Sequence, residues 1–450
     1  MRTASFQKRS RTILYLALPI IGGMLSQTLM NFADMIMVGH LENADQALNA
    51  QGVASQAVWA VASLLIGIGS AVQSWSSRRM GAGQPRQSGI ALSLALWSSI
   101  GIGLPVSLLG VLYASDIIQL LIHNPSVRSL AEPYYTYRTA SWFLVMMNFS
   151  FRGFFNGISR PRVYFTVIWI SQIANVAFSL VLIYGFGALP AMGVAGAGLG
   201  TTLATLLGTI IYFIIAFFYQ SSHGVFHIKP TGTANWRVLQ TLWKLSIPAG
   251  LTGVLTSAGF LVFMVITDQI GTTEAAASTI LVQIASLSFL PAIGFGLAAA
   301  TLVSRNLGAG KADEAYQWGL DTAKLGSGLL GAIGLLFVIA PGEFLTLATH
   351  NPQIIARAEL ILQILGLGLF FDSIGNILSQ ALIGAGHIRP VLIWNVVGMW
   401  LIFLPGAWLF GLYYNGGMPG LWLPLFVYRT GLALAMLIIF RHRHWVHIRI

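Results

Sequence analysis

The chain of 450 residues is organised by long apolar runs that are separated by short polar segments. A helix that spans a membrane needs about 20 consecutive, mainly apolar residues. Runs of this kind predict twelve spanning helices, at about residues 12–38, 48–77, 88–112, 130–157, 162–185, 192–219, 239–267, 275–304, 316–340, 353–384, 390–412 and 419–440. The pattern therefore predicts an all-α integral membrane protein.

The twelve predicted helices form two sets of six that resemble each other. The segment IGIGSAVQSWSSRRMGAG (66–83) matches IGFGLAAATLVSRNLGAG (293–310) without a gap at an offset of 227. In NGISRPRV (156–163), the residues Gly157, Arg160 and Pro161 match Gly386, Arg389 and Pro390 of GAGHIRPV (384–391) at an offset of 229. Six helices per repeat place the start of both repeats on the same side of the membrane. We therefore predict two lobes related by a pseudo-two-fold axis along the membrane normal, with a central cavity between them.

The predicted domains are an N-lobe at residues 1–219, a polar cytoplasmic linker at 220–237, and a C-lobe at 238–450 that ends in a basic tail. Parallel repeats of this kind are typical of transporters that expose a central site to each side of the membrane in turn. One chain contains both lobes, so a monomer would suffice for transport.

Composition and charge agree with this class of protein. The chain is 56% hydrophobic and only 8% charged, with a mean hydropathy of +0.76, which excludes a soluble protein of this length. The net charge of +11 collects in alternate loops and at both ends, so the positive-inside rule predicts cytoplasmic termini in the cell (inner) membrane. The tail RHRHWVHIRI is expected to contact anionic lipid headgroups rather than nucleic acid. The absence of Cys excludes disulfides and thiolate chemistry.

Two carboxylates, Asp34 and Asp372, lie well inside predicted spanning helices. A charge at the centre of a bilayer costs at least about 3 kcal/mol, so both side chains should face the protein interior or a water-filled cavity. In the first lobe only Arg152 could neutralise Asp34, and only if it folds inward. Burial without a partner favours the protonated acid, and such a group can carry a proton or a cation. Asp34 and Asp372 are therefore candidate ion-coupling residues.

Amides and hydroxyls repeat at helical spacing around these acids and predict polar stripes on three helices. The stripes are Gln27, Asn31 and Asp34 on the first helix, Gln172, Asn175 and Ser179 on the fifth, and Asp372, Asn376 and Ser379 on the tenth. They indicate a polar core inside apolar surroundings. Hydrogen bonds that only hold the bundle together are the alternative explanation.

Other chemistry finds little support in the sequence. There is no HExxH spacing and no GxxxxGK[ST] segment, so we expect neither an enzyme, a bound metal or cofactor, nor an ATP site. The driving force should be an ion gradient or the gradient of the substrate itself. A membrane enzyme would need clustered His or acidic residues at one interface, and a channel would need a repeated filter.

The chain resembles the MATE (multidrug and toxic compound extrusion) family of twelve-helix antiporters. The resemblance is carried by LALPIIGGMLSQTLMNFADMIMVGHL (16–41), by the paired MGAG and LGAG loops, and by NGISRPRV with its counterpart GAGHIRPV. The family's early helix-1 proline and later aspartate look like Pro19 and Asp34. The resemblance implies a multidrug efflux antiporter that exports small cationic or amphipathic compounds in exchange for H⁺ or Na⁺.

Two branches of the family place their working carboxylates differently. The DinF-like branch pairs the helix-1 aspartate with an Asn-x-x-x-Asp on helix 5, where this chain has Asn175 and Ser179. The NorM-like branch pairs a helix-10 aspartate, here Asp372, with a helix-7 glutamate that this chain lacks. The sequence keeps one acid of each arrangement and does not select a branch. A lone carboxylate flanked by amides suits H⁺ better than Na⁺, so we expect H⁺ coupling through Asp34, with Na⁺ as the second choice.

The resemblance also suggests a hinge and a substrate cavity. Pro19 could bend the first helix during transport, or it could be a static kink. The expected substrate-cavity residues are Gln27, Met30, Asn31, Phe149, Gln172 and Asn376. Met and Phe are also ordinary lipid-facing residues. The alternative function is a lipid-linked precursor flippase, which would need an Arg-rich cavity; the candidates Arg138 and Arg152 are predicted near helix ends.

Overall fold

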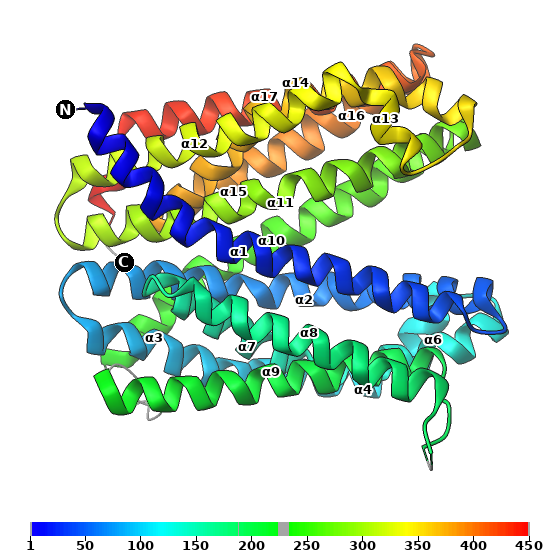
Figure 1. The fold of residues 1–450 in the computed structure, drawn as a ribbon, viewed down its shortest axis with the longest axis horizontal. Helices are drawn as coiled ribbons and strands as arrows, with labels where there is room; N and C mark the ends of the chain where they lie inside the picture. The colour runs from blue at the N-terminus through cyan, green and yellow to red at the C-terminus, as the bar shows by residue number, and fades with distance from the viewer. Residues whose placement is uncertain (1, 188, 224–233, 449–450) are drawn as a thin grey trace. The chain divides into compact units, whose positions relative to one another are not determined.

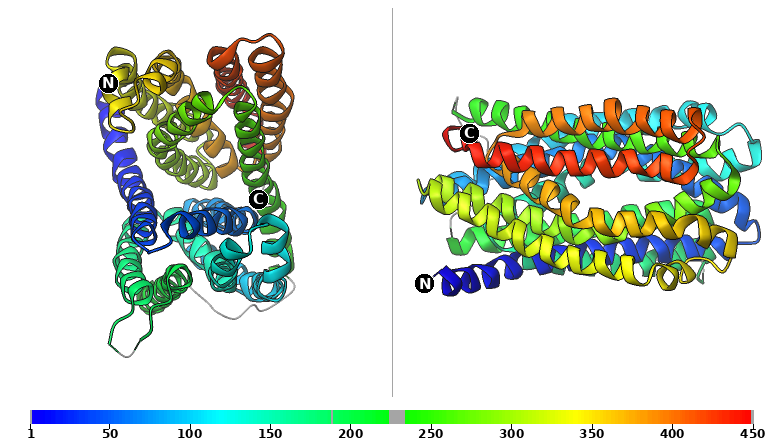
Figure 2. Two further views of the ribbon diagram at one scale, coloured as in Figure 1. Left: turned by 90° about the vertical axis from the view of Figure 1, so that its right-hand side faces the viewer. Right: turned by 90° about the horizontal axis from the view of Figure 1, so that it is seen from above.

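The computed structural model describes residues 2–187, 189–223 and 234–448, and these residues are almost entirely helical (Figures 1 and 2). The α-helices are α1 (Arg2–Gly39), α2 (Ala44–Gly81), α3 (Pro85–Ser98), α4 (Leu104–Leu112), α5 (Ala114–Leu121), α6 (Pro125–Ala140), α7 (Trp142–Gly157), α8 (Pro161–Tyr184), α9 (Val194–His223), α10 (Ala234–Asp268), α11 (Thr272–Gly308), α12 (Ala312–Ile339), α13 (Pro341–Thr346), α14 (Pro352–Gly384), α15 (Ile388–Val397), α16 (Leu404–Ala407) and α17 (Gly417–His442). Most of the predicted linker, residues 224–233, lies outside the described residues.

Within the described ranges, eleven helices are long and apolar enough to cross a membrane. The predicted span at 130–157 is divided into α6 and α7 at Ser141. The Ser141 hydroxyl donates to the Arg138 carbonyl oxygen at 2.8 Å, and its N–H donates to the same oxygen at 3.2 Å. Local bonds of this kind compete with the regular helical bonds and interrupt the helix. The interruption places Arg138 in the last turn of α6, in the middle of the span rather than near its end.

The third and eleventh predicted spans contain wide π-helical turns, at Ser99–Gly103 and Gly398–Phe403. Each turn is followed by a Leu-Pro pair, whose prolines are Pro105 and Pro405. A proline has no N–H to donate to the carbonyl four residues earlier, so the preceding turn widens. The same local cause therefore acts once in each repeat, but at different places, because the third span corresponds to α12 and not to the eleventh span.

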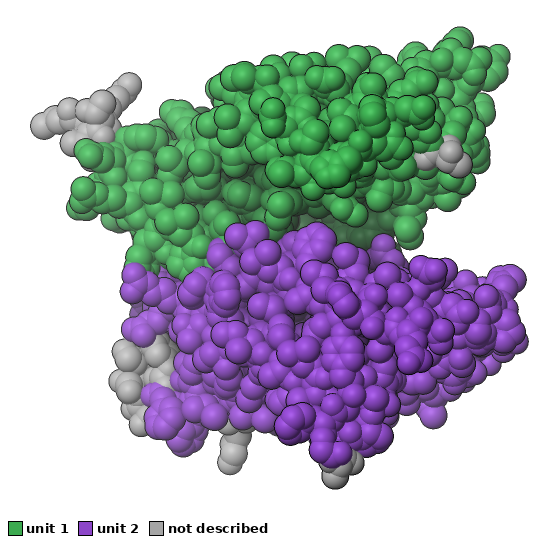
Figure 3. Space-filling model, turned by 45° about the vertical axis from the view of Figure 1, so that its right-hand side comes forward, with its two compact units in different colours: residues 1–21, 251–450 green, residues 22–250 purple. Residues whose placement is uncertain are grey.

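The chain forms two compact units, coloured separately in Figure 3. Residues 22–250 form the N-unit, and residues 1–21 with 251–450 form the C-unit. Helices α1 and α10 each pass from one unit to the other shortly after a proline, Pro19 or Pro248. The compact units therefore differ from the predicted lobes, 1–219 and 238–450, because the beginning of each repeat packs with the other repeat. In the C-unit, Arg9 pairs with Asp321 of α12 at 2.9 Å.

Helix α14 packs against α11, α12 and α17 in the C-unit (Figure 1). In the N-unit, α2 packs against α6 and α7, and α9 packs against α8 and α6. The turn after α2 and the turn after α11 have the same hydrogen bonds, and each ends on a left-handed glycine, Gly83 (φ +71°) or Gly310 (φ +72°). The predicted repeat at an offset of 227 is thus confirmed in the backbone.

The second predicted match, at an offset of 229, is wrong in register by two residues. Helix α7 ends at Gly157 and α14 ends at Gly384, and their turns carry positive φ at Ser159 (+62°) and Gly386 (+86°). Both turns therefore follow the same offset of 227 as the first match. The sequence comparison aligned the Arg-Pro pairs instead, although the two loops present that pair at different positions.

Close packing of α2 against α7 depends on glycine, and this gives a stability prediction. A Cβ at Gly153 of α7 would overlap the carbonyl oxygen of Gly69 of α2. A Cβ at Gly52, which also lies on α2, would meet nothing within 4 Å. We expect Gly153→Ala to separate the helices and to cost about 1–3 kcal/mol of stability. Thermal unfolding of the purified protein, followed by tryptophan fluorescence, measures this, with Gly52→Ala as the matched control. Equal melting temperatures for the two variants would contradict the packing assignment.

Candidate functional site

The N-unit encloses a cavity of about 180 Å³ between α1, α2, α6, α7, α8 and α9. We call it the N-unit cavity. It brings together six of the residues predicted for the site: Gln27, Asn31, Asp34, Phe149, Gln172 and Asn175. Its other polar lining residues are Ser55, Arg138, Ser141, Asn148, Arg152, Tyr164, Ser171, Thr201, Thr205 and Tyr212. Polar stripes from α1 and α8 therefore face one common space inside the unit.

Asp34 and Asn175 form the hydrogen-bonded centre of the N-unit cavity. With its amide nitrogen facing the carboxylate, Asn175 donates to Asp34 Oδ1 at 3.0 Å and to Oδ2 at 3.3 Å. The amide oxygen of Asn175 then accepts from Thr201 Oγ1 at 3.0 Å. A carboxamide that is fixed on one side by a hydroxyl presents its N–H groups to the acid on the other side. The Asp34 carboxylate is thus oriented by α8 and α9.

Two guanidinium groups share this cavity with Asp34. Arg138 comes from the last turn of α6, and its charge acts on the Asp34 carboxylate without forming one of the ion pairs found among the described residues. Arg152 comes from α7 and lies over the rings of Phe149 and Tyr164, at 5.2 and 5.0 Å from the ring centroids. Arg138 thus lies at a helix end, as expected, whereas Arg152 lies inside α7, and both line the cavity.

Three other predicted site residues lie outside the N-unit cavity. Ser179 is fully buried on α8, where it packs against Gly200, and its hydroxyl lies close enough to the Asp34 carboxylate to act on it as a donor. Met30 is half-buried on α1 and does not line the cavity. Pro19 lies on the part of α1 that belongs to the C-unit, three residues before Gly22, where the N-unit begins.

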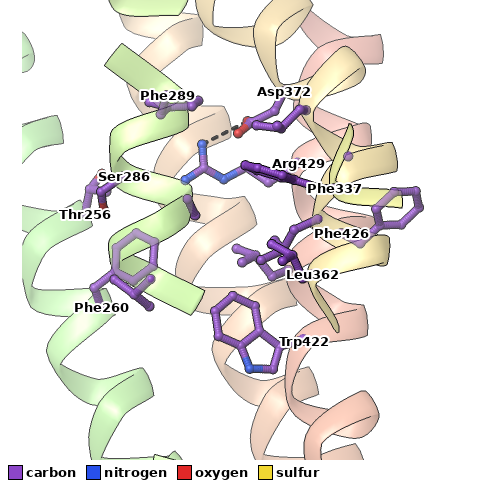
Figure 4. A pocket seen from close by; sticks show the side chains of 16 residues that line it. Thr256, Phe260, Ser286, Phe289, Phe337, Leu362, Asp372, Trp422, Phe426 and Arg429 are labelled. Atoms are coloured by element: carbon purple, nitrogen blue, oxygen red, sulfur yellow. Dashed lines mark hydrogen bonds and ion pairs between the residues drawn. The ribbon is translucent and has the colours of Figure 1, made fainter. Parts of the chain in front are cut away.

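The C-unit has a separate cavity of about 260 Å³, which contains Asp372 (Figure 4). Its lining is mainly aromatic and aliphatic, with contributions from α10, α11, α12, α14 and α17. Arg429 of α17 points into it and donates to Asp372 Oδ1 at 2.9 Å, while its guanidinium lies 5.3 Å from the Phe289 ring. Asp372 is therefore neutralised inside its own unit. Asn376, one turn further along α14, does not line this cavity.

The sequence reasoning missed Arg429 as the partner of Asp372. A signal was present, because Arg429 lies inside the last apolar run, and a cation at that depth requires a partner or a water-filled cavity. It also missed Asn148 and Tyr164 as lining residues of the N-unit cavity. Among the described residues, no three His, Cys, Asp or Glu side chains are grouped to hold a metal ion.

Comparison with known proteins supports the architecture. The chain is 26% identical to "Probable multidrug resistance protein NorM" of Thermotoga maritima, over 94% of this chain and 91% of that protein. It is 27% identical to the protein of the same name from Rhodopseudomonas palustris, over 92% and 88%. A crystal structure of "MATE in the straight conformation" superposes with a TM-score of 0.87 at 20% identity, over 97% of this chain and 96% of that one.

The MatE family model matches the chain twice, at residues 19–181 and 248–409. The two matches begin at Pro19 and Pro248, the prolines of the two helices that change unit. They cover one repeat each and together most of the chain. The chain therefore belongs to the MATE transporter family.

Proposed function

We propose that this protein is a secondary active multidrug efflux antiporter that exports cationic and amphipathic compounds in exchange for H⁺, with Asp34 as the coupling residue. The relatives named as probable multidrug resistance proteins support the efflux of drugs. The helices that could cross a membrane support a multi-pass protein. The proposal places it as a monomer in the inner membrane, with both termini in the cytoplasm.

The observation that carries this proposal is the different state of the two membrane carboxylates. Asp372 is held by Arg429 at 2.9 Å, so its charge is already compensated. Asp34 lines a cavity and has no ion-pair partner among the described residues; its closest bonds come from the neutral amide of Asn175. The charge of an acid in that setting can be neutralised either by a proton or by a cationic ligand, so one can replace the other. The proposal therefore assigns coupling to Asp34 and charge balance to Asp372.

The ligand set at Asp34 favours H⁺ over Na⁺. A bound Na⁺ is a hard cation that needs several oxygen ligands, as Ca²⁺ and Mg²⁺ do. In the part of the chain that the structure describes, Asp34 supplies the only carboxylate of the cavity lining. The amide of Asn175 directs its N–H groups, rather than its oxygen, at that carboxylate. A proton needs only one carboxylate oxygen. Na⁺ remains the second candidate.

The proposed cycle follows from these contacts. Ionised Asp34 binds a cationic drug; protonation from outside removes the charge and releases the drug, and the proton then leaves to the cytoplasm. Helix α1 could transmit the change, because Ile21 packs against Gly294 in the C-unit and Gly23 packs against the Tyr164 ring in the N-unit. Just before these contacts the helix lacks one hydrogen bond, because Pro19 has no N–H to donate to the carbonyl four residues earlier. The proposal therefore assigns Pro19 as the hinge.

The flippase alternative draws support from one observation, the presence of Arg138 and Arg152 in the N-unit cavity. A pyrophosphate group carries several negative charges, and Asp34 in the same cavity would repel it. We therefore retain drug efflux as the main proposal.

The choice of ion gives a direct prediction for proteoliposomes loaded with a fluorescent cationic drug. We expect a pH gradient alone to drive transport, and we expect a Na⁺ gradient at equal pH to give no more transport than liposomes without protein. The reason is the single carboxylate of the N-unit cavity. Collapsing the pH gradient with nigericin in K⁺ buffer is the control. Transport driven by Na⁺ alone would reject H⁺ coupling.

A further inference from the structure

The charged lining of the N-unit cavity has more positive than negative side chains. Among the described residues that line it, Asp34 is the only acid, and it is accompanied by Arg138 and Arg152. When Asp34 is ionised the three groups sum to one positive charge, and when it is protonated they sum to two. A cavity that served only simple cations would gain nothing from two guanidinium groups, because like charges repel the ligand.

Arg152 is held in a way that leaves its donors available. The rings of Phe149 and Tyr164 lie 5.2 and 5.0 Å from its guanidinium carbon. Contacts of this type use the face of the guanidinium plane, whereas its N–H groups point outward in the plane. Neither Arg152 nor Arg138 takes part in an ion pair among the residues that the structure describes.

Four buried polar atoms of the same lining have no hydrogen-bond partner among the described residues. They are Arg138 Nε, Tyr164 OH, Ser171 Oγ and Asn148 Oδ1. Three of them carry a hydrogen to donate, and only Asn148 Oδ1 is restricted to accepting. Buried donors without an acceptor are costly, so an acceptor-rich group in the cavity would be strongly favoured. A carboxylate provides such a group.

We propose that Arg138 and Arg152 form an anion subsite beside Asp34, so that the N-unit cavity selects zwitterionic amphiphiles: the anionic group of the substrate binds the two arginines, and its cationic group faces Asp34. This assignment rests on the proposed transport function and narrows its substrate class. The cavity of about 180 Å³ accepts the charged end of such a compound, and the apolar remainder extends out of it.

The test compares two dyes that differ by one charge. Tetramethylrhodamine carries a carboxylate and a cationic ring system, and tetramethylrhodamine methyl ester carries the cation alone. Binding to the full-length protein in nanodiscs is measured by fluorescence anisotropy, with empty nanodiscs subtracted. We expect the wild type to prefer the acid over the ester, and we expect Arg138→Gln and Arg152→Gln each to reduce that preference by about tenfold or more.

Two controls separate binding from folding. Arg128→Gln removes a cation from the same helix, α6. Arg128 donates to the Ile122 carbonyl oxygen at 3.4 Å and does not line the N-unit cavity, so this variant should keep the wild-type preference. Arg138→Lys and Arg152→Lys retain the charge and should recover part of the preference. The subsite would be overturned if the glutamine variants lost affinity for both dyes equally. It would also be overturned if these variants kept the wild-type preference for the acid over the ester.

Two further results are distinct from these. A dye preference that depends on the arginines, in a protein that transports neither dye under a pH gradient, would support the subsite and reject the transport function. Farnesyl diphosphate is added as a competitor of both dyes. If it displaces them from Asp34→Asn as well as from the wild type, the zwitterion assignment is overturned in favour of a lipid diphosphate.

Discussion

Replacing Asp34 with asparagine is expected to reduce pH-driven drug efflux to the level of liposomes without protein. The substitution keeps the size of the side chain but removes both the negative charge and the proton that the cycle exchanges. Loss of one partner of a desolvated charge pair typically costs 2 kcal/mol or more, so affinity for a monocationic drug should fall roughly 30-fold or more. Efflux of a fluorescent cation from proteoliposomes measures the first effect, and equilibrium binding measures the second.

The matched control removes the other membrane carboxylate without leaving a lone arginine. In Asp372→Asn with Arg429→Gln, both members of the C-unit ion pair become neutral. We expect this double variant to retain pH-driven efflux, because its cavity is separate from the one that contains Asp34. Efflux that survives Asp34→Asn but fails in the double variant would place coupling in the C-unit.

Replacing Arg429 alone is expected to destabilise the protein strongly. Arg429→Met leaves the Asp372 carboxylate in an aromatic cavity without its 2.9 Å partner. Breaking a buried pair from one side typically costs 3–5 kcal/mol. The two side chains are 16% and 22% exposed, so water reaches them in part, and we expect about 3 kcal/mol. Thermal unfolding in detergent gives the shift.

A double-mutant cycle shows whether the pair itself is responsible. Asp372→Leu combined with Arg429→Met removes both charges and adds apolar groups to a cavity that Phe289 and Phe426 also line (Figure 4). We expect the double variant to regain most of the stability that either single substitution loses. If the two losses simply add, the charges do not compensate each other, and Asp372 requires another explanation.

Much of the architecture was predictable, because a membrane imposes simple rules on sequence. Lengths of apolar runs predicted the spanning helices, and the paired loops at 66–83 and 293–310 predicted the repeat. The break at Ser141 was not predictable, because serine is tolerated inside helices and only its hydrogen bonds to Arg138 show the interruption. Nor could the sequence show that residues 1–21 pack in the C-unit, since apolar surface alone does not specify its partner.

The sequence predicted those residues of the candidate site that share one face of a helix. Gln27, Asn31 and Asp34 recur at helical spacing, and the structure places all three on one cavity, together with Asn175. The sequence did not show that Arg138 and Arg152 line this cavity. The depth of Arg138 depends on the interruption of its helix, and the orientation of Arg152 depends on the rings beneath it. Both are tertiary effects that spacing along one helix does not encode.

The most direct test of the central claim is the number of protons released when a monocationic drug binds to the purified protein in weakly buffered detergent solution. If Asp34 exchanges a proton for the drug, the wild type and the Asp372→Asn, Arg429→Gln double variant release protons, and Asp34→Asn releases none even at drug concentrations that saturate it. Unchanged proton release from Asp34→Asn would contradict the claim and show that another group couples transport to H⁺.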